Sequence, residues 1–230
     1  MLVLAAHGTR DPAGVVEVDR MADALRERLP SVPVRVAYAD VRQPNVTEVL
    51  AEVTGPAVVV PAFLASGYHV RVDLPAQISA SGRQDVVLTT PLGPDPGLVT
   101  AVHERLAQAG WRPGDSVVLA AAGSSDARAL SDVDTAAQLL AERIGAAVPV
   151  GYVSTARPKV GEVVAACREQ RPGARVALAT WLLAPGVFHT SLAEAGADLV
   201  AAPIGAHPSL INTVASRYRL ATGSVPVDHS

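Results

Sequence analysis

The sequence predicts an α/β protein of two similar lobes, each a roughly four-stranded parallel sheet with helices on both faces. Short apolar runs alternate with longer amphipathic segments along the whole chain, which is the pattern of strands joined by right-handed helical crossovers. The order of these elements starts again halfway along the chain. The length of 230 residues is sufficient for one large domain or two small ones.

The first half contains four apolar runs short enough to be buried strands. They lie at 2–6, 34–38, 57–61 and 86–90. The segments between them have helical periodicity. Val18, Met21 and Leu25 recur on one helix face, and Pro44 stands near the start of another helix, where its missing N–H is not needed. The helices are expected at 15–29, 43–53, 70–81 and 98–109.

The same alternation resumes in the second half. Strands are expected at 117–121, 148–152, 176–183 and 199–202. Helices are expected at 129–145, 159–169, 188–195 and 209–220. The polar tail at 222–230 is expected to be frayed, since nothing in its pattern ties it down.

Five blocks of the first half align, in order, with blocks of the second half. LAAHGTRDP (4–12) aligns with LAAAGSSDA (119–127), and FLASGYH (63–69) aligns with LLAPGVFH (182–189) with one inserted residue. An ordered series of this kind indicates an internal duplication. Because WRPGD (111–115) interrupts the pattern, we expect an N-terminal lobe over 1–112 and a C-terminal lobe, a degenerate repeat, over 113–230.

The composition excludes several classes of protein. Apolar residues make up 49% of the chain and charged residues 18%, which is typical of a core-rich globular protein. A net charge of −3 gives no reason to expect nucleic acid or an anionic membrane as partner. The single cysteine excludes an intramolecular disulfide and fits a reducing compartment, and no apolar run approaches the length of a membrane span. We therefore expect a cytoplasmic protein, and a monomer in which two lobes are fused.

Two histidines follow two strands of the first lobe. His7 follows the strand at 2–6 and His69 follows the strand at 57–61, and open α/β sheets bind ligands beyond the carboxyl ends of their strands. Asp73 lies four residues after His69, on the same helix face, where it could orient the imidazole or pair on the surface. The alternative for each histidine is a bond to a neighbouring carbonyl without further function.

Two neutral imidazoles suit a borderline divalent metal such as Fe²⁺, Co²⁺, Ni²⁺ or Zn²⁺. With no cysteine nearby, they indicate an open and transient site rather than a closed structural one. In the second lobe Ala122 stands at the His7 position, whereas His189 aligns with His69. We therefore expect one site per chain, in the first lobe. The alternative is that the first histidine was lost from one repeat because neither copy matters.

Basic residues and a glycine turn lie near the same strand ends. Arg10, Arg42 and Arg71 could bind the carboxylates of a polyanionic substrate, although any one of them could equally be a solvated surface residue. Ser66 and Gly67 form a turn whose backbone N–H groups could approach a ligand. The chain contains neither a dinucleotide-binding or phosphate-loop glycine motif nor a nucleophile elbow.

HGTRDP (7–12) after the first strand and FLASGYHVRVDLP (63–75) after the third resemble the signature of the class II chelatases of the sirohydrochlorin chelatase group. The resemblance implies insertion of Fe²⁺ or Co²⁺ into sirohydrochlorin, on the way to sirohaem or cobalamin. It implies that His7 and His69 bind the metal and accept protons. The metal is then a substrate, and no cofactor is permanently bound. Some cobalt enzymes of the family carry a histidine- or cysteine-rich extension, which this chain lacks, so Fe²⁺ is favoured.

Two alternatives remain open at this point. One is a non-catalytic carrier of a tetrapyrrole or a metal, which would bind its ligand stoichiometrically and form no metallated product. The other is a flavodoxin-like enzyme whose histidines act on another small molecule without a metal.

Overall fold

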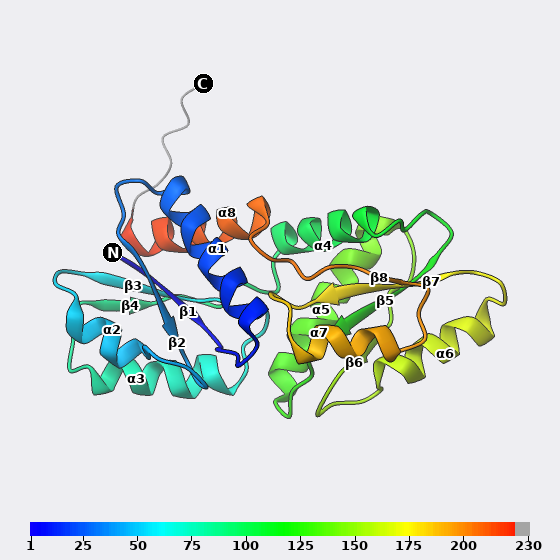
Figure 1. The fold of residues 1–230 in the computed structure, drawn as a ribbon, viewed down its shortest axis with the longest axis horizontal. Helices are drawn as coiled ribbons and strands as arrows, with labels where there is room; N and C mark the ends of the chain where they lie inside the picture. Colours follow the sequence, from blue (N-terminus) through cyan, green and yellow to red (C-terminus); the bar gives the residue numbers. More distant parts are fainter. Residues whose placement is uncertain (224–230) are drawn as a thin grey trace, which may run out of the picture.

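The computed structural model describes residues 1–223 and contains two four-stranded parallel sheets (Figure 1). The strand order is β2-β1-β3-β4 in the first sheet and β6-β5-β7-β8 in the second. The strands are β1 (Leu2–Ala6), β2 (Val34–Tyr38), β3 (Ala57–Pro61), β4 (Val86–Leu88), β5 (Ser116–Ala121), β6 (Val150–Tyr152), β7 (Val176–Trp181) and β8 (Leu199–Val200). The predicted fold class and the duplicated architecture are confirmed. The expectation for the tail beyond residue 223 lies outside the described residues.

The central strands carry the uninterrupted apolar runs seen in the sequence. Every residue of β1 and β3 is buried, as expected for parallel strands covered on both faces. In the register of the sheet Ala5 lies opposite Pro61, so β1 and β3 end at the same level. The edge strands β4 and β8 are short and only partly buried.

Helices connect the strands in the predicted order. They are α1 (Pro12–Arg28), α2 (Val46–Glu52), α3 (Leu74–Ala80), α4 (Pro96–Gln108), α5 (Ala127–Ile144), α6 (Val160–Gln170), α7 (Val187–Ser191) and α8 (Pro208–Thr222). The first helix begins earlier than expected because the Asp11 side chain accepts the Ala13 N–H as an N-cap and Pro12 occupies the first turn. The helix expected at 70–81 is instead a π-helical turn, η1 (His69–Asp73), that leads into α3; a short turn of 3₁₀-helix, η2 (Leu192–Glu194), follows α7.

The last helix of each repeat packs on the sheet of the other repeat. The helix α4 contacts β7 of the second sheet, and α8 contacts β3 of the first sheet. In Figure 1, α8 lies beside α1 over the first sheet, whereas α4 lies over the second. Leu2 of β1, Leu98 of α4 and Leu210 of α8 belong to one continuous hydrophobic core. The two lobes therefore share a core. Because α4 and α8 each pack on the sheet of the other repeat, each lobe of the folded protein contains one helix from the other half of the chain. We propose residues 1–112 and 113–230 as the two repeat units.

Polar contacts at the helix N-termini hold the exchanged helices together. Asp95 caps α4 and also contacts Thr213 and Arg217 of α8, with the Arg217 Nη2 atom 3.4 Å from a carboxylate oxygen. His207 caps α8, and its Nε2 atom lies 3.1 Å from Glu104 of α4. The two ends of the helix pair thus make reciprocal contacts.

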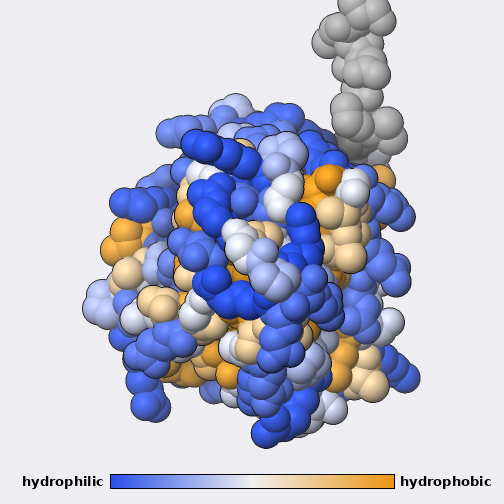
Figure 2. Space-filling model, turned by 90° about the vertical axis from the view of Figure 1, so that its right-hand side faces the viewer, coloured by the Kyte–Doolittle hydropathy of each residue, from blue (hydrophilic) through white to orange (hydrophobic). Residues whose placement is uncertain are grey.

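The surface at the end formed by the second lobe is mainly hydrophilic. Figure 2 shows the end formed by the second lobe, where polar residues predominate and apolar residues form separate patches. Among the described residues, no helix has the length and apolarity needed to cross a bilayer.

Candidate active site

The structure brings His7 and His69 together at the carboxyl end of the first sheet. The centroids of the two imidazole rings are 4.5 Å apart, and the rings meet edge to face at 80°. Phe63 lies beside both rings, with centroid distances of 6.0 Å to His7 and 6.2 Å to His69. This spacing places both rings within reach of a single metal ion.

The turn after β1 explains where His7 points. Gly8 has a φ of 99°, and a Cβ atom at this position would lie 2.1 Å from the Asp40 carbonyl oxygen. Only glycine fits this close approach of two backbones. The Asp40 N–H donates to the His7 carbonyl over 3.0 Å, which fixes the turn and leaves the His7 side chain exposed at the end of the strand.

Each imidazole has one nitrogen engaged by the protein. The Nδ1 atom of His7 lies 3.1 Å from the Gly8 carbonyl oxygen, and that of His69 lies 2.6 Å from a carboxylate oxygen of Asp73. A carbonyl or carboxylate oxygen accepts, so in the neutral rings we assign the proton to Nδ1. The Nε2 lone pairs of both rings are then available to a metal ion or a proton.

The surroundings leave room for further ligands. Among residues 1–223, no group of three or more His, Cys, Asp or Glu side chains is placed to hold a metal ion. A metal bound by His7 and His69 would keep positions for water or for a substrate. The pair is therefore suited to transient binding and transfer.

The two histidines open into a cleft of about 710 Å³ between the lobes. It lies at the carboxyl ends of both sheets, and residues from both lobes line it, most of them apolar. A volume of this size is in the range of small-molecule sites. From the second lobe it receives Ala122, Trp181, Phe188 and His189.

The second lobe has no histidine pair of its own. Ala122 occupies the position of His7, as the sequence alignment indicated. The Nε2 atom of His189 lies 3.2 Å from the carbonyl oxygen of Ala201. In His69, its counterpart in the first lobe, Nε2 has no such partner among the described residues, and Nδ1 contacts Asp73 instead.

The turn between β3 and η1 is attached to the second lobe. The Ser66 N–H donates to Asp132 of α5 over 2.7 Å, and Arg71 forms an ion pair with Asp126, the N-cap of α5. The backbone N–H of Arg128 and the Arg71 guanidinium lower the pKa of Asp126. Of the binding residues expected in this segment, Gly67 lines the cleft, whereas Ser66 and Arg71 do not.

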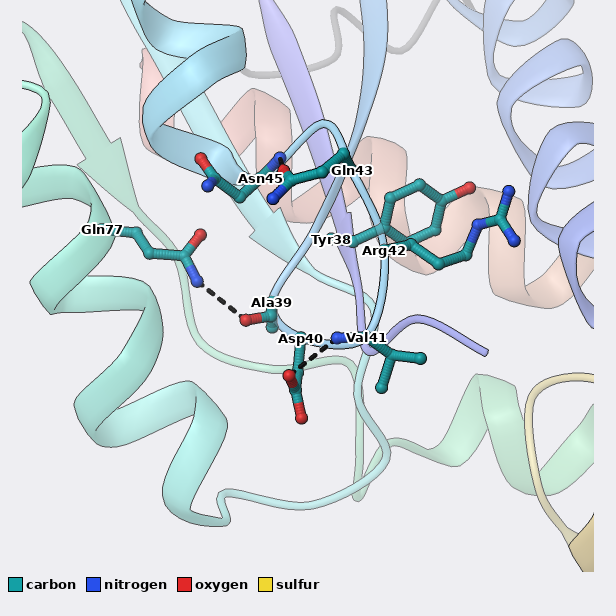
Figure 3. A pocket seen from close by; sticks show the side chains of 8 residues that line it. All are labelled: Tyr38, Ala39, Asp40, Val41, Arg42, Gln43, Asn45 and Gln77. Atoms are coloured by element: carbon teal, nitrogen blue, oxygen red, sulfur yellow. Dashed lines mark hydrogen bonds between the residues drawn. The ribbon is translucent and has the colours of Figure 1, made fainter. Parts of the chain in front are cut away.

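Arg42 lies at a second cavity, of about 340 Å³, next to the loop between β2 and α2 (Figure 3). Its guanidinium lies 5.8 Å from the centre of the Tyr38 ring, and its Nη1 atom lies 3.5 Å from the Thr9 carbonyl oxygen. Arg10 is exposed in the turn after β1. Neither arginine is among the residues that line the cleft.

Sequence reasoning did not single out the aromatic residues of the cleft. Phe63, Tyr68, Trp181 and Phe188 all line it. A signal was present, because aromatic residues make up only 3% of the chain and two of these precede His69 and His189 directly.

Two α/β lobes around a cleft, with two adjacent imidazoles at its wall, are the arrangement expected of a protein that binds a metal ion and a small molecule at one site. The model of the CbiX family matches residues 1–109 and 116–221. The chain belongs to the CbiX family, and with it to the class II chelatases that the sequence resembles.

Known proteins agree with this assignment. A sirohydrochlorin cobaltochelatase of Methanothermobacter thermautotrophicus is 28% identical over 131 residues, covering 47% of this chain and 91% of the relative. That relative therefore corresponds to about half of this chain. SirB from Bacillus subtilis, solved with Fe³⁺, superposes with a TM-score of 0.83 at 23% identity over 99% of this chain and 98% of SirB. SirB from the subspecies spizizenii, solved with cobalt, gives 0.78 at 22% identity over 95% of this chain and 93% of SirB. These two structures establish the likeness of fold.

Proposed function

We propose that this chain inserts a divalent metal ion into sirohydrochlorin, with Fe²⁺ as the preferred metal and Co²⁺ as the second. The observation that carries the proposal is the His7–His69 pair, whose rings lie 4.5 Å apart and have free Nε2 atoms at the wall of a cleft. The family assignment and the name of the methanogen relative support an enzyme of this class over a carrier.

The reaction requires two kinds of chemistry that neutral imidazoles supply. The metal ion must lose part of its water shell, and both inner pyrrole N–H protons must leave the macrocycle as the metal enters. An imidazole Nε2 atom can bind the metal in place of water or accept a proton. A protonated imidazole can do neither.

The Asp73 carboxylate supports this role. By accepting the Nδ1–H of His69 over 2.6 Å, it holds the ring in one tautomer and in one orientation. His7 receives a weaker version of the same support from the Gly8 carbonyl. The two rings are therefore not equivalent: a carboxylate holds His69, whereas a backbone carbonyl holds His7.

The substrate carries many carboxylates and approaches a protein of net charge −3, so it needs local positive charge. We assign this role to Arg10, Arg42 and Arg71 at the rim of the first lobe. We assign backbone contacts with the substrate to Ser66 and Gly67, of which Gly67 lines the cleft. Arg71 would have to share its guanidinium with Asp126, to which it is already paired.

The preference for iron rests on composition. The printed sequence has one cysteine, which is buried, and its six histidines form no cluster along the chain. The names of the relatives and neighbours include both cobalt and Fe³⁺, so a direct competition between Fe²⁺ and Co²⁺ is the decisive comparison.

The test is the visible spectrum of sirohydrochlorin incubated with the protein and each metal. We expect spectral conversion to the metallated product over many turnovers, and at least a ~10²-fold loss in the His7→Ala and His69→Ala variants. His103→Ala, at a histidine next to Trp111 and outside the cleft, is the matched control and should keep its activity. Binding of one equivalent without product would favour the carrier. Full activity in both cleft variants would contradict the proposal.

A further inference from the structure

The cleft is lined by half of the few Phe, Trp and Tyr residues of the chain. Both phenylalanines, one of the two tryptophans and one of the four tyrosines line it. Aromatic side chains with no catalytic chemistry of their own serve in such places as flat surfaces for a flat ligand. Their gathering at one cleft therefore points to a planar, conjugated substrate.

Two of these aromatic residues are exposed to solvent. Tyr68 has 60% of its surface exposed and Phe188 has 45%. Exposing large apolar side chains is unfavourable, and where they gather at a cleft they mark a binding surface. The two residues come from opposite lobes and from corresponding positions of the repeat, since each directly precedes the cleft histidine of its own lobe.

The two walls of the cleft differ in chemistry. The wall of the first lobe carries His7 and His69, and Tyr68 lies next to them, with its ring 6.2 Å from that of His69. The wall of the second lobe has Ala122 at the His7 position, and it includes Trp181, which is only 3% exposed. The first wall carries a pair of histidines, whereas the second carries one histidine, His189, whose Nε2 atom already contacts the Ala201 carbonyl.

We propose that Tyr68 and Phe188 stack against the tetrapyrrole from opposite lobes and hold it with one face towards His7 and His69. This inference rests on the proposed function. The metal then enters from one face of the ring only. The other face lies on the apolar wall of the second lobe, which keeps water from it. Tyr68 and Phe188 are thus binding residues that determine specificity for a planar macrocycle, and neither is required to bind the metal.

The experiment measures binding of metal-free sirohydrochlorin by the change in its fluorescence, with no metal present. Tyr68→Ala and Phe188→Ala should each raise the Kd about tenfold, within the range seen when aromatic stacking partners are removed. Tyr68→Phe and Phe188→Tyr should restore wild-type binding. Leu220→Ala removes an apolar side chain of α8 that is 73% exposed and does not line the cleft, so it should change nothing.

A second measurement separates stacking from a general disturbance of the site. Binding of Co²⁺ alone, followed by its visible absorption, should stay within about twofold of wild type in both alanine variants and should be lost in His7→Ala. If the wild type metallates sirohydrochlorin and both alanine variants bind it with unchanged Kd, this inference is wrong and the proposed function stands. If the alanine variants bind weakly as expected but the wild type forms no product, the stacking role stands and the proposed function is wrong.

Discussion

Replacing Asp73 with Asn tests how much the orientation of His69 contributes to activity. The substitution keeps the size of the side chain and removes the negative charge that accepts the Nδ1–H over 2.6 Å. An amide can accept this proton only weakly, and it can also donate to the ring, which would favour the tautomer with its proton on Nε2. That tautomer cannot bind a metal through Nε2.

The structure sets the expected size of the effect. A hydrogen bond to a charged group contributes about 1.5–3 kcal/mol when well shielded, and loss of a carboxylate behind a metal-binding histidine typically costs about 10–100-fold in metal affinity or activity. Here the side chains of His69 and Asp73 are each 29% exposed, so solvent weakens the interaction. We therefore expect the lower end of the range, about a tenfold loss of kcat/KM.

The assay is the initial rate of sirohydrochlorin metallation, with Co²⁺ affinity and thermal unfolding measured on the same samples. Glu104→Gln is the matched control, because it alters a second histidine–carboxylate pair, in which His207 Nε2 lies 3.1 Å from Glu104 outside the cleft. The control should leave the rate unchanged. A rate within twofold of wild type for a folded Asp73→Asn variant would refute the argument, as would an equal loss in the control.

Three further predictions concern the rest of the site. His189→Ala should lower the rate less than His69→Ala does, because its Nε2 atom already contacts the Ala201 carbonyl; an equal loss would show that both lobes supply the reactive histidines. Replacing Arg10, Arg42 and Arg71 together with Ala should raise KM at low salt and leave kcat nearly unchanged, because each exposed contact contributes about 0.2–1 kcal/mol to binding. The rise in KM should fade at 1 M salt, where the Debye length is ~3 Å. An unchanged KM at low salt would show that these arginines do not bind the substrate. The pKa of Asp126 is lowered in the folded state, so its carboxylate stabilises the fold fully above its unfolded pKa of about 3.9. This contribution is lost as the pH falls through the folded pKa. Asp126→Asn should therefore lower the melting temperature at pH 7 but not at the acid end of a thermal unfolding series.

The strands and the repeat were predictable because burial on both faces of a sheet produces apolar runs that can be seen in the local sequence. Runs such as 2–6 and 57–61 are apolar throughout since both faces of the sheet are covered, and aligned blocks report a duplication directly. The exchange of α4 and α8 between the lobes produces no comparable pattern in the sequence. An apolar helix face shows that a helix packs on something, but not on which of two similar sheets.

The histidine pair was predictable for a similar reason, since strands that end at one level bring the residues after them together. The directions of the arginine side chains were not. Arg71 follows the same strand as His69, but it pairs with Asp126 of the other lobe, and a contact across the lobes depends on an arrangement that local patterns do not encode. The aromatic surface of the cleft was missed because it becomes apparent only when residues from both repeats are seen side by side.

The exchanged helices α4 and α8 make the folding of each lobe depend on the other. A chain divided between residues 112 and 113 would leave one fragment with α4 and no sheet for it to cover, and the other fragment with α8 in the same situation. Each fragment would also lack the helix that completes its own core, because Leu98 and Leu210 belong to a single cluster. Neither half is then a self-sufficient folding unit, and the two should complement each other only when mixed. The lobes should accordingly unfold in one cooperative transition, in which both walls of the cleft are lost together.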